Sequence, residues 1–236
     1  MKENVIAIDG PSGSGKSTIA KIVSTKLGLT YLDTGAMFRA IAYSLKDFDI
    51  DFTQPTLSIV ESDQIKAYLK DLQFEYGVDE NILIRLNNED LTSTIREHFV
   101  SELASHTSKF SIIRDYLKDK QREITLTKSS VLEGRDIGTV IFPNALVKIF
   151  LTASSSERAK RRFDQLVEKD IKNKDLFSVE EILKDIESRD SQDQNRDIAP
   201  LTKAIDAVEI DTTSLNIDAV VELIIYEYNK KVRASK

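Results

Sequence analysis

A segment near the N-terminus combines three glycines, a lysine and hydroxyl side chains. Residues 10–17 read Gly-Pro-Ser-Gly-Ser-Gly-Lys-Ser and fit the phosphate-loop pattern G-x-x-x-x-G-K-[ST]. Backbone N–H groups can close around phosphate oxygens there, because glycines have no Cβ and a following helix adds its positive N-terminal end. We expect Lys16 to face solvent and to reach nucleotide phosphates, and Ser17 to offer a hydroxyl to Mg²⁺. A glycine-rich turn without a ligand is the alternative.

Two arginines follow predicted strands. Arg39 lies one helical turn beyond residues 33–35, and Arg135 with Asp136 follows residues 131–133. Ligands of open α/β sheets bind outside the carboxyl ends of the strands, so both arginines are predicted to face the same crevice as the phosphate loop. Surface salt bridges are the alternative for each arginine taken alone.

Two charged segments come later in the chain. Residues 156–162 contain Arg158, Arg161 and Arg162, which suit a lid that neutralises a moving phosphoryl group, or else a solvated helix face. Residues 189–196 place Arg189, Asp193 and Arg196 at i, i+4 and i+7. That spacing predicts a helical face for ligand binding or an intrahelical ladder of ion pairs.

The elements that must position these residues alternate between strand and helix, which indicates an α/β fold with a five-stranded, doubly wound parallel sheet. The predicted strands are residues 5–9, 29–32, 131–133, 147–151 and 207–211. The predicted helices are residues 16–27 (ended by Gly28), 36–45, 95–120 with a break near Ser108, 154–168, 179–189 and 217–231.

One stretch interrupts the alternation. Residues 72–76 and 82–86 are typical of short antiparallel strands, with turns at 77–81 and 87–90. Residues 48–94 are therefore predicted to form a small α+β insert. The core would comprise residues 1–47 and 95–236, with a lid at about 156–178.

Composition excludes several kinds of chemistry. The chain has 236 residues, a net charge of −6, no cysteine and two histidines. Disulfides, thiolate metal sites and cysteine nucleophiles are impossible, and two histidines alone are too few for a zinc site. The acidic balance argues against nucleic-acid binding, because general phosphate attraction needs surplus cations. With no apolar run long enough for a membrane span and no signal segment, we expect a cytoplasmic protein without an obligate protein partner.

Four segments together resemble the bacterial cytidylate kinases. They are residues 10–17, residues 31–39 (Tyr-Leu-Asp-Thr-Gly-Ala-Met-Phe-Arg), residues 133–143 (Glu-Gly-Arg-Asp-Ile-Gly-Thr-Val-Ile-Phe-Pro) and residues 189–200. The resemblance runs in order along essentially the whole chain and includes the insert, which in that family holds the nucleoside monophosphate. It implies transfer of the ATP γ-phosphoryl group to CMP or dCMP, with Mg²⁺ required.

The same resemblance implies a role for each matched residue. Arg39 and Arg135 would hold the acceptor phosphate; Thr34, Arg114, Asp136 and Arg196 would surround the cytosine; Ser105, Arg189 and Asp193 would meet the sugar; and Arg158, Arg161 and Arg162 would form the ATP lid. The ATP-binding residues would be Gly10, Pro11, Ser12, Gly13, Ser14, Gly15, Lys16, Ser17 and Thr18. Catalysis would rest on Lys16, Arg135 and the three lid arginines.

The chain departs from the family pattern at a few positions. Thr34 stands for a common Ser and keeps the hydroxyl, whereas Phe38 stands for a usual Tyr and loses it. Glu133 replaces a more usual Asp. The loop ends Lys-Ser-Thr where many relatives read Lys-Gly-Thr, so either Ser17 or Thr18 could supply the metal hydroxyl.

Other functions remain open on sequence grounds. A kinase for UMP or a non-nucleotide metabolite could use the same scaffold, and a nucleotide-binding module without catalysis is a further alternative. A nucleotide-dependent switch is disfavoured, because neither D-x-x-G nor N-K-x-D occurs in the chain.

Overall fold

The chain forms two compact units in the structure, a computed structural model that describes residues 3–126, 128–169 and 177–234. Unit 1 comprises Met1–Leu32 and Lys128–Lys236, and unit 2 comprises Asp33–Thr127. The predicted insert, residues 48–94, falls inside unit 2. The division into a core of residues 1–47 and 95–236 with that insert stays a prediction.

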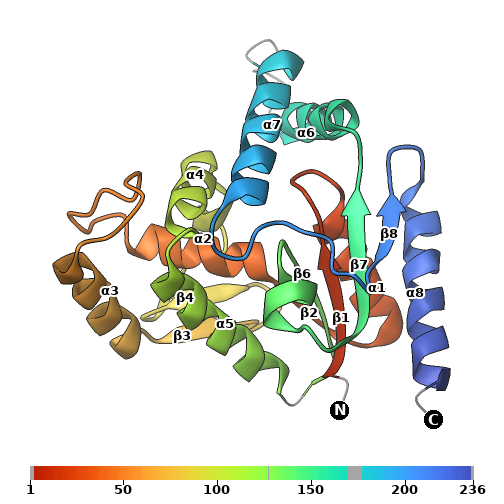
Figure 1. The fold of residues 1–236 in the computed structure, drawn as a ribbon, viewed down its shortest axis with the longest axis horizontal. Helices are drawn as coiled ribbons and strands as arrows, with labels where there is room; N and C mark the ends of the chain where they lie inside the picture. Colours follow the sequence, from red (N-terminus) through yellow and green to blue (C-terminus); the bar gives the residue numbers. More distant parts are fainter. Residues whose placement is uncertain (1–2, 127, 170–176, 235–236) are drawn as a thin grey trace. The chain divides into compact units, whose positions relative to one another are not determined.

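A five-stranded sheet is the frame of unit 1 (Figure 1). Its strands are β1 (Glu3–Asp9), β2 (Thr30–Asp33), β6 (Ser130–Gly134), β7 (Ala145–Thr152) and β8 (Val208–Asp211). They lie in the order β2-β6-β1-β7-β8, and β1 pairs in parallel with both β6 and β7. All five predicted strands and the α/β class are confirmed. Because Asp9 pairs with Gly134, the carboxyl ends of β1 and β6 meet at one edge.

Two helices cover one face of this sheet. Helix α1 (Lys16–Leu27) begins directly after the phosphate loop, and Gly28 ends it with a φ of +64°, as predicted. Helix α8 (Ile217–Ala234) packs against α1 and β7. Their apolar side chains enclose alternate strand residues in the core, which includes Ile6, Ile8, Ile19, Val23, Val131, Val147, Ile149, Val221 and Ile224.

A single π-helical turn, η2 (Ile137–Ile141), lies against β1, β6 and β7. Side chains alternate along a strand, so Lys148 points away from the core face to which Val147 and Ile149 belong. A Cβ built on Gly138 would lie 3.2 Å from Lys148 Cδ. The turn therefore covers the second face of the sheet, just after the predicted site residues Arg135 and Asp136.

Helices α6 (Ser155–Lys169) and α7 (Val179–Asn195) pack side by side (Figure 1). Helix α7 continues six residues beyond its predicted end at Arg189. Apolar periodicity stops there, but ion pairs of Asp190 and Asp193 with other elements hold the last turns. Of the predicted lid, residues 170–176 lie outside the described residues.

Unit 2 contains the remaining elements. They are α2 (Thr34–Ser44), α3 (Ile59–Asp71), β3 (Phe74–Tyr76), β4 (Ile84–Leu86), β5 (Glu89–Asp90), η1 (Thr94–Arg96), α4 (His98–Thr107) and α5 (Ser111–Thr125). The predicted helix over residues 95–120 is thus three pieces, and the predicted break near Ser108 is confirmed. Helix α2 packs against α4, α5 and β4.

The predicted hairpin in unit 2 is confirmed and gains a third strand. Strand β4 pairs antiparallel with both β3 and β5. Asn87 and Asn88 connect β4 to β5 with φ values of +46° and +69°, a conformation that Asn tolerates better than most residues. What the sequence indicated as a turn over residues 87–90 is therefore a two-residue turn followed by a short strand.

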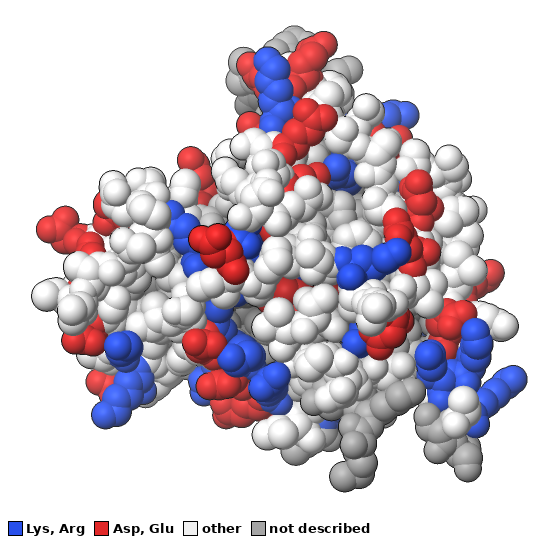
Figure 2. Space-filling view, in the orientation of Figure 1, with Lys and Arg blue, Asp and Glu red and all other residues white. Residues whose placement is uncertain are grey.

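Charges of both signs are interspersed on the molecular face drawn in Figure 2. That face is mixed rather than uniformly basic, in keeping with the net charge of −6. None of the helices in the described ranges is both long enough and apolar enough to cross a membrane.

The end of α1 provides a test of the fold. Gly28→Ala is expected to lower the free energy of unfolding by about 1 kcal/mol, because a residue with a Cβ is strained at a positive φ. No heavy atom lies within 4 Å of the position that this Cβ would take, so the loss would be conformational alone. Urea unfolding followed by circular dichroism measures it. Lys26→Ala, an exposed change in the same helical turn, is the control and should change the free energy by less than about 0.5 kcal/mol.

Candidate functional site

The phosphate loop of unit 1 depends on three glycine conformations. Gly10, Gly13 and Gly15 have φ values of +151°, +77° and +89°. A Cβ on Gly10 would lie 2.0 Å from the carbonyl oxygen of Leu151 in β7, so the loop can pass the sheet only because position 10 has no side chain. The predicted loop is thus confirmed in its strand-to-helix context.

Carbonyl oxygens of the loop are held by donors from several directions. The Pro11 oxygen accepts from Lys16 Nζ at 2.6 Å and from Ser14 Oγ at 3.0 Å. The Ser12 oxygen accepts from Arg158 Nη1 at 2.9 Å, and the Thr212 hydroxyl lies 3.3 Å from the Ser14 oxygen. In a trans peptide the N–H points opposite to the C=O, so fixing these oxygens also fixes the N–H groups that would face a phosphate.

Lys16 is buried, with 5% of its surface exposed, which corrects the expectation that it faces solvent. Burial is the main reason that its pKa lies below the usual value, and the nearby positive charge of Arg135 adds to the effect. The carboxylates of Glu133, Asp193 and Asp9 oppose the shift. Its ammonium group donates to the Pro11 oxygen, so this cation lies directly at the loop.

Asp9, which the sequence analysis did not single out, ends β1 beneath the loop. Its two carboxylate oxygens accept from the backbone N–H groups of Ile137 at 2.8 Å and Gly138 at 2.7 Å. These residues directly follow Arg135 and Asp136, so Asp9 fixes the turn that carries both. Burial raises the pKa of Asp9 to about 6, against the two backbone hydrogen bonds, which lower it.

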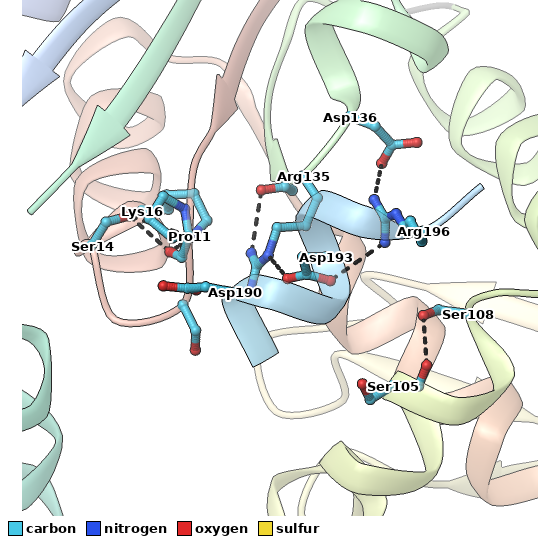
Figure 3. Close-up of polar contacts among 12 residues, drawn as sticks. Pro11, Ser14, Lys16, Ser105, Ser108, Arg135, Asp136, Asp190, Asp193 and Arg196 are labelled. Carbon is cyan, nitrogen blue, oxygen red and sulfur yellow. Dashed lines mark hydrogen bonds and ion pairs between the residues drawn. The ribbon is translucent and has the colours of Figure 1, made fainter. Parts of the chain in front are cut away.

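Four charged side chains of unit 1 form a continuous network (Figure 3). Asp193 Oδ2 accepts from Arg135 Nε at 2.7 Å, and its Oδ1 lies 3.5 Å from Arg196 Nη1. Arg196 Nη2 lies 4.0 Å from Asp136 Oδ1, and Arg196 Nε donates to the Ala199 oxygen at 2.5 Å. Asp193 thus pairs with cations of two segments, and a purely intrahelical ladder is excluded.

The network shifts pKa values in both directions. Burial alone would lower the pKa of Arg135, but the carboxylates of Asp193, Glu133 and Asp190 together outweigh it and the net shift is upward. Burial would raise the pKa of Asp193, but the guanidinium groups of Arg135, Arg196 and Arg189 together outweigh it and the net shift is downward. Both groups are therefore held in their charged forms at neutral pH.

The three predicted lid arginines have different environments. Arg158 is buried; besides Ser12, its Nη1 lies 2.6 Å from Asp190 Oδ2 on α7. Arg161 donates to the Thr212 carbonyl oxygen at 2.6 Å, whereas Arg162 is exposed. The described part of the predicted lid thus brings one arginine against the phosphate loop and a second against the loop after β8.

Asp33 forms a salt bridge with Arg39, the predicted phosphate-binding residue of unit 2. Its Oδ1 caps α2 by accepting from the Ala36 N–H at 2.7 Å. Its Oδ2 lies 3.4 Å from Arg39 Nη2 and 3.3 Å from Arg96 Nη1. Arg96, which the sequence analysis did not select, therefore shares a carboxylate with Arg39 although the two are 57 positions apart in the chain.

The other predicted residues of unit 2 lie on α2, α4 and α5. Arg114 is buried, donates to the Ser108 oxygen at 3.0 Å, and has its guanidinium carbon 5.3 Å from the centre of the Phe38 ring. Phe38 therefore keeps the ring face for a cation–π contact although it lacks a tyrosine's hydroxyl. Thr34 is buried in the first turn of α2, and the Ser105 oxygen accepts from Ser108 Oγ at 3.1 Å.

The candidate residues for a metal site are two hydroxyl residues, which are exposed, and one carboxylate, which is buried. Ser17 and Thr18 are exposed in the first turn of α1. Glu133 is buried, and its Oε1 accepts from the Tyr31 hydroxyl at 3.1 Å. A cation that prefers oxygen ligands could bind the hydroxyl of Ser17 or Thr18. The hydrogen bond from Tyr31 to Glu133 would remain intact.

The fold and the loop together indicate the general class of protein to which this chain belongs. A parallel sheet whose first strand ends in a G-x-x-x-x-G-K-[ST] loop, followed by a helix, is characteristic of phosphate-loop nucleotide-binding proteins. The cytidylate kinase family model matches residues 6–230. The chain therefore belongs to the cytidylate kinase family, and the resemblance found in the sequence is confirmed.

Individual relatives agree with this membership. The chain is 41% identical to a cytidylate kinase of Fusobacterium nucleatum over the full length of both. It is 42% identical to a cytidylate kinase of Thermosipho melanesiensis, with 97% of this chain and 98% of the relative covered. It is also 43% identical to a bifunctional pantoate ligase/cytidylate kinase of Prochlorococcus marinus, and there it spans only 43% of the relative's length.

The buried carboxylate of Asp9 predicts a pH effect on stability. A pKa of about 6 in the folded protein, above the usual 3.8, means that folding takes up a proton between these values, so the contribution of Asp9 to stability falls as pH rises through this window. Asp9→Asn removes that titration. Relative to the parent protein, its free energy of unfolding should rise by about 2 kcal/mol between pH 4.5 and pH 7.

Urea unfolding at the two pH values tests this prediction. Asp185→Asn, which removes one exposed carboxylate from α7, is the control and should follow the parent protein. Equal pH dependence in Asp9→Asn and the parent would show that burial of Asp9 does not disfavour its charged form.

Proposed function

We propose that this protein transfers the γ-phosphoryl group of ATP to CMP or dCMP and yields ADP and CDP or dCDP. Family membership supports this proposal. The observation that carries it is local to unit 1. The phosphate loop contains the buried Lys16, and Arg135, which is held in its charged form by Asp193, is near enough to affect the charge of this lysine. A cation for the donor's phosphates and one for the transferred group are what phosphoryl transfer needs.

The reaction requires positioning more than covalent help. An oxygen of the acceptor's own phosphate attacks the γ-phosphorus, a new O–P bond forms, and the bond to the bridging β–γ oxygen breaks as ADP leaves. No side chain has to act as a nucleophile or general base. Charge neutralisation falls to Lys16, Arg135 and the arginines of α6, of which Arg158 adjoins the loop.

Preorganisation supports these roles. Asp193 holds Arg135, and Asp9 holds the turn after it, through contacts within the chain itself. A cation fixed in advance does not need to reorganise as negative charge moves in the transition state. When a nucleotide binds, the Lys16 ammonium group would move from the Pro11 oxygen to a phosphate oxygen.

The acceptor-binding roles that the family resemblance implies are proposed for the residues of each unit by itself. In unit 1 we assign Arg135 to the phosphate, Asp136 and Arg196 to the base, and Arg189 and Asp193 to the sugar. In unit 2 we assign Arg39 to the phosphate, Thr34 and Arg114 to the base, and Ser105 to the sugar. The salt bridge of Arg39 with Asp33 supports its assignment, because it fixes a cation in the first turns of α2.

The exposed hydroxyls of Ser17 and Thr18 fit the Mg²⁺ ion that the family implies, because such an ion takes oxygen ligands and keeps several waters. When bound, the ion would neutralise negative charge on the β- and γ-phosphates. Glu133, whose Oε1 accepts from the Tyr31 hydroxyl, is the carboxylate that we propose for the surroundings of this ion.

A panel of acceptors tests the proposed function. Initial rates with ATP and Mg²⁺ should be highest with CMP and dCMP and much lower with UMP, AMP and GMP. Equal or higher rates with UMP would indicate the related function of a UMP kinase. Repetition with EDTA in excess of the metal tests the requirement for Mg²⁺ and should abolish turnover.

Lys16→Ala is expected to lower kcat by at least about a thousandfold, because it removes the cation of the phosphate loop. Circular dichroism should show a folded protein. Lys21→Ala, a change of the same kind on the exposed face of α1, is the control and should keep the parent's rate. Turnover by Lys16→Ala within tenfold of the parent would rule out the assigned role.

Asp136→Ala tests how the base is selected. Cytosine offers an amino donor where uracil offers a carbonyl oxygen, so a carboxylate at that edge favours CMP by about 1–3 kcal/mol. The ratio of kcat/KM for CMP to that for UMP should fall at least about tenfold in the variant. If this ratio is unchanged, the role of Asp136 is to orient Arg196, whose Nη2 lies 4.0 Å away.

A further inference from the structure

Asp190 lies on α7 beside residues assigned to the acceptor but has no assigned role. Its side chain is 14% exposed, and its Oδ2 lies 2.6 Å from Arg158 Nη1. Its Oδ1 is buried and has no hydrogen-bond partner within the part of the chain that the structure describes. A buried carboxylate needs a compensating charge, and Arg158 supplies it.

Arg158 connects this carboxylate to the phosphate loop. The same nitrogen, Nη1, donates to the Ser12 carbonyl oxygen at 2.9 Å, and Nε donates to the Ala153 oxygen at 3.0 Å. A Cβ built on Gly13 would lie 3.1 Å from Arg158 Cβ, so the side chain lies directly against the loop. With 7% exposure, the guanidinium has little freedom to leave this position.

The contact sets the direction of a group that would bind phosphate. Because the peptide between Ser12 and Gly13 is planar and trans, an oxygen directed at Arg158 directs the Gly13 N–H the opposite way. An ion pair with Asp190 orients Arg158 more tightly than neutral contacts would, since charge-assisted hydrogen bonds are shorter and stronger. The position of α7 therefore bears on the geometry of the phosphate loop.

We propose that Asp190 is a positioning residue that couples occupancy of the acceptor site to ATP affinity through Arg158 and the Ser12 carbonyl oxygen. The proposal rests on the function proposed above, in which Arg189, Asp193 and Arg196 of the same helix end bind CMP. Contacts of CMP with these residues would add to the ion pairs that already hold this end of α7, and with it Asp190, so ATP would meet a loop whose Ser12 oxygen is held more firmly. Coupling of this kind is reciprocal: ATP must tighten CMP binding by the same factor.

Calorimetric titration with a non-hydrolysable ATP analogue and Mg²⁺ measures the coupling without turnover. The ratio of its dissociation constants without and with saturating CMP should be about tenfold in the parent protein, within the usual range for coupled sites. In Asp190→Asn the ratio should fall below about threefold, mainly because affinity in the presence of CMP is lost. Asp185→Asn, an isosteric change at an exposed position of α7, should keep the parent's ratio.

Asp190→Asn leaves Arg158 with an uncompensated buried charge and could fail to fold, so a second variant is needed as a test. Asp190→Asn combined with Arg158→Gln leaves a neutral pair and should also lose the coupling. A parent-like ratio in either folded variant, or a ratio near one in the parent, overturns the proposal. CDP formation by the parent is assayed separately: coupling without CDP formation would contradict the proposed function alone.

Discussion

The rest of unit 1 depends on one constraint: the carbonyl oxygens of the phosphate loop must point outward and be held there by hydrogen-bond donors. A loop that binds phosphate must direct its N–H groups inward, and it can do so only if its oxygens find donors elsewhere. Here Lys16, Arg158 and Thr212 supply donors from α1, α6 and the end of β8. The sheet order places β1 beside β7, and β7 beside β8, so these elements converge on one loop.

A second constraint is the burial of charge. Asp193 between Arg135 and Arg196, and Asp190 against Arg158, bring α7 into contact with two other segments of unit 1 through ion pairs. Such pairs add little net stability when desolvation is considered, but they fix orientation, because a buried charge that loses its partner is strongly disfavoured. For the phosphoryl transfer that we propose, this would favour a rigid arrangement of cations around the transferred group.

Two expectations from the sequence differ from the structure. Lys16 is buried rather than facing solvent, with its ammonium group donating to the Pro11 oxygen of its own loop, and α7 continues past Arg189 to Asn195. For α7, partners distant in sequence decide the outcome. Apolar periodicity contains no information about an ion pair between Asp193 and Arg135, which are 58 positions apart.

By itself, the sequence determined the α/β class, the five strands, the phosphate loop and the family, because these depend on local patterns: alternation of strand and helix, and glycines spaced for close backbone approach. A cue to Asp9 was also present, a carboxylate at the end of an apolar strand. Only the tertiary structure decided that Asp9 accepts from Ile137 and Gly138, that Arg96 joins Arg39 at Asp33, and that Asp190 reaches the phosphate loop through Arg158. Such contacts are set by the packing of elements far apart in the chain, and the physical reason is that a buried polar group must find a partner wherever the fold brings one within reach.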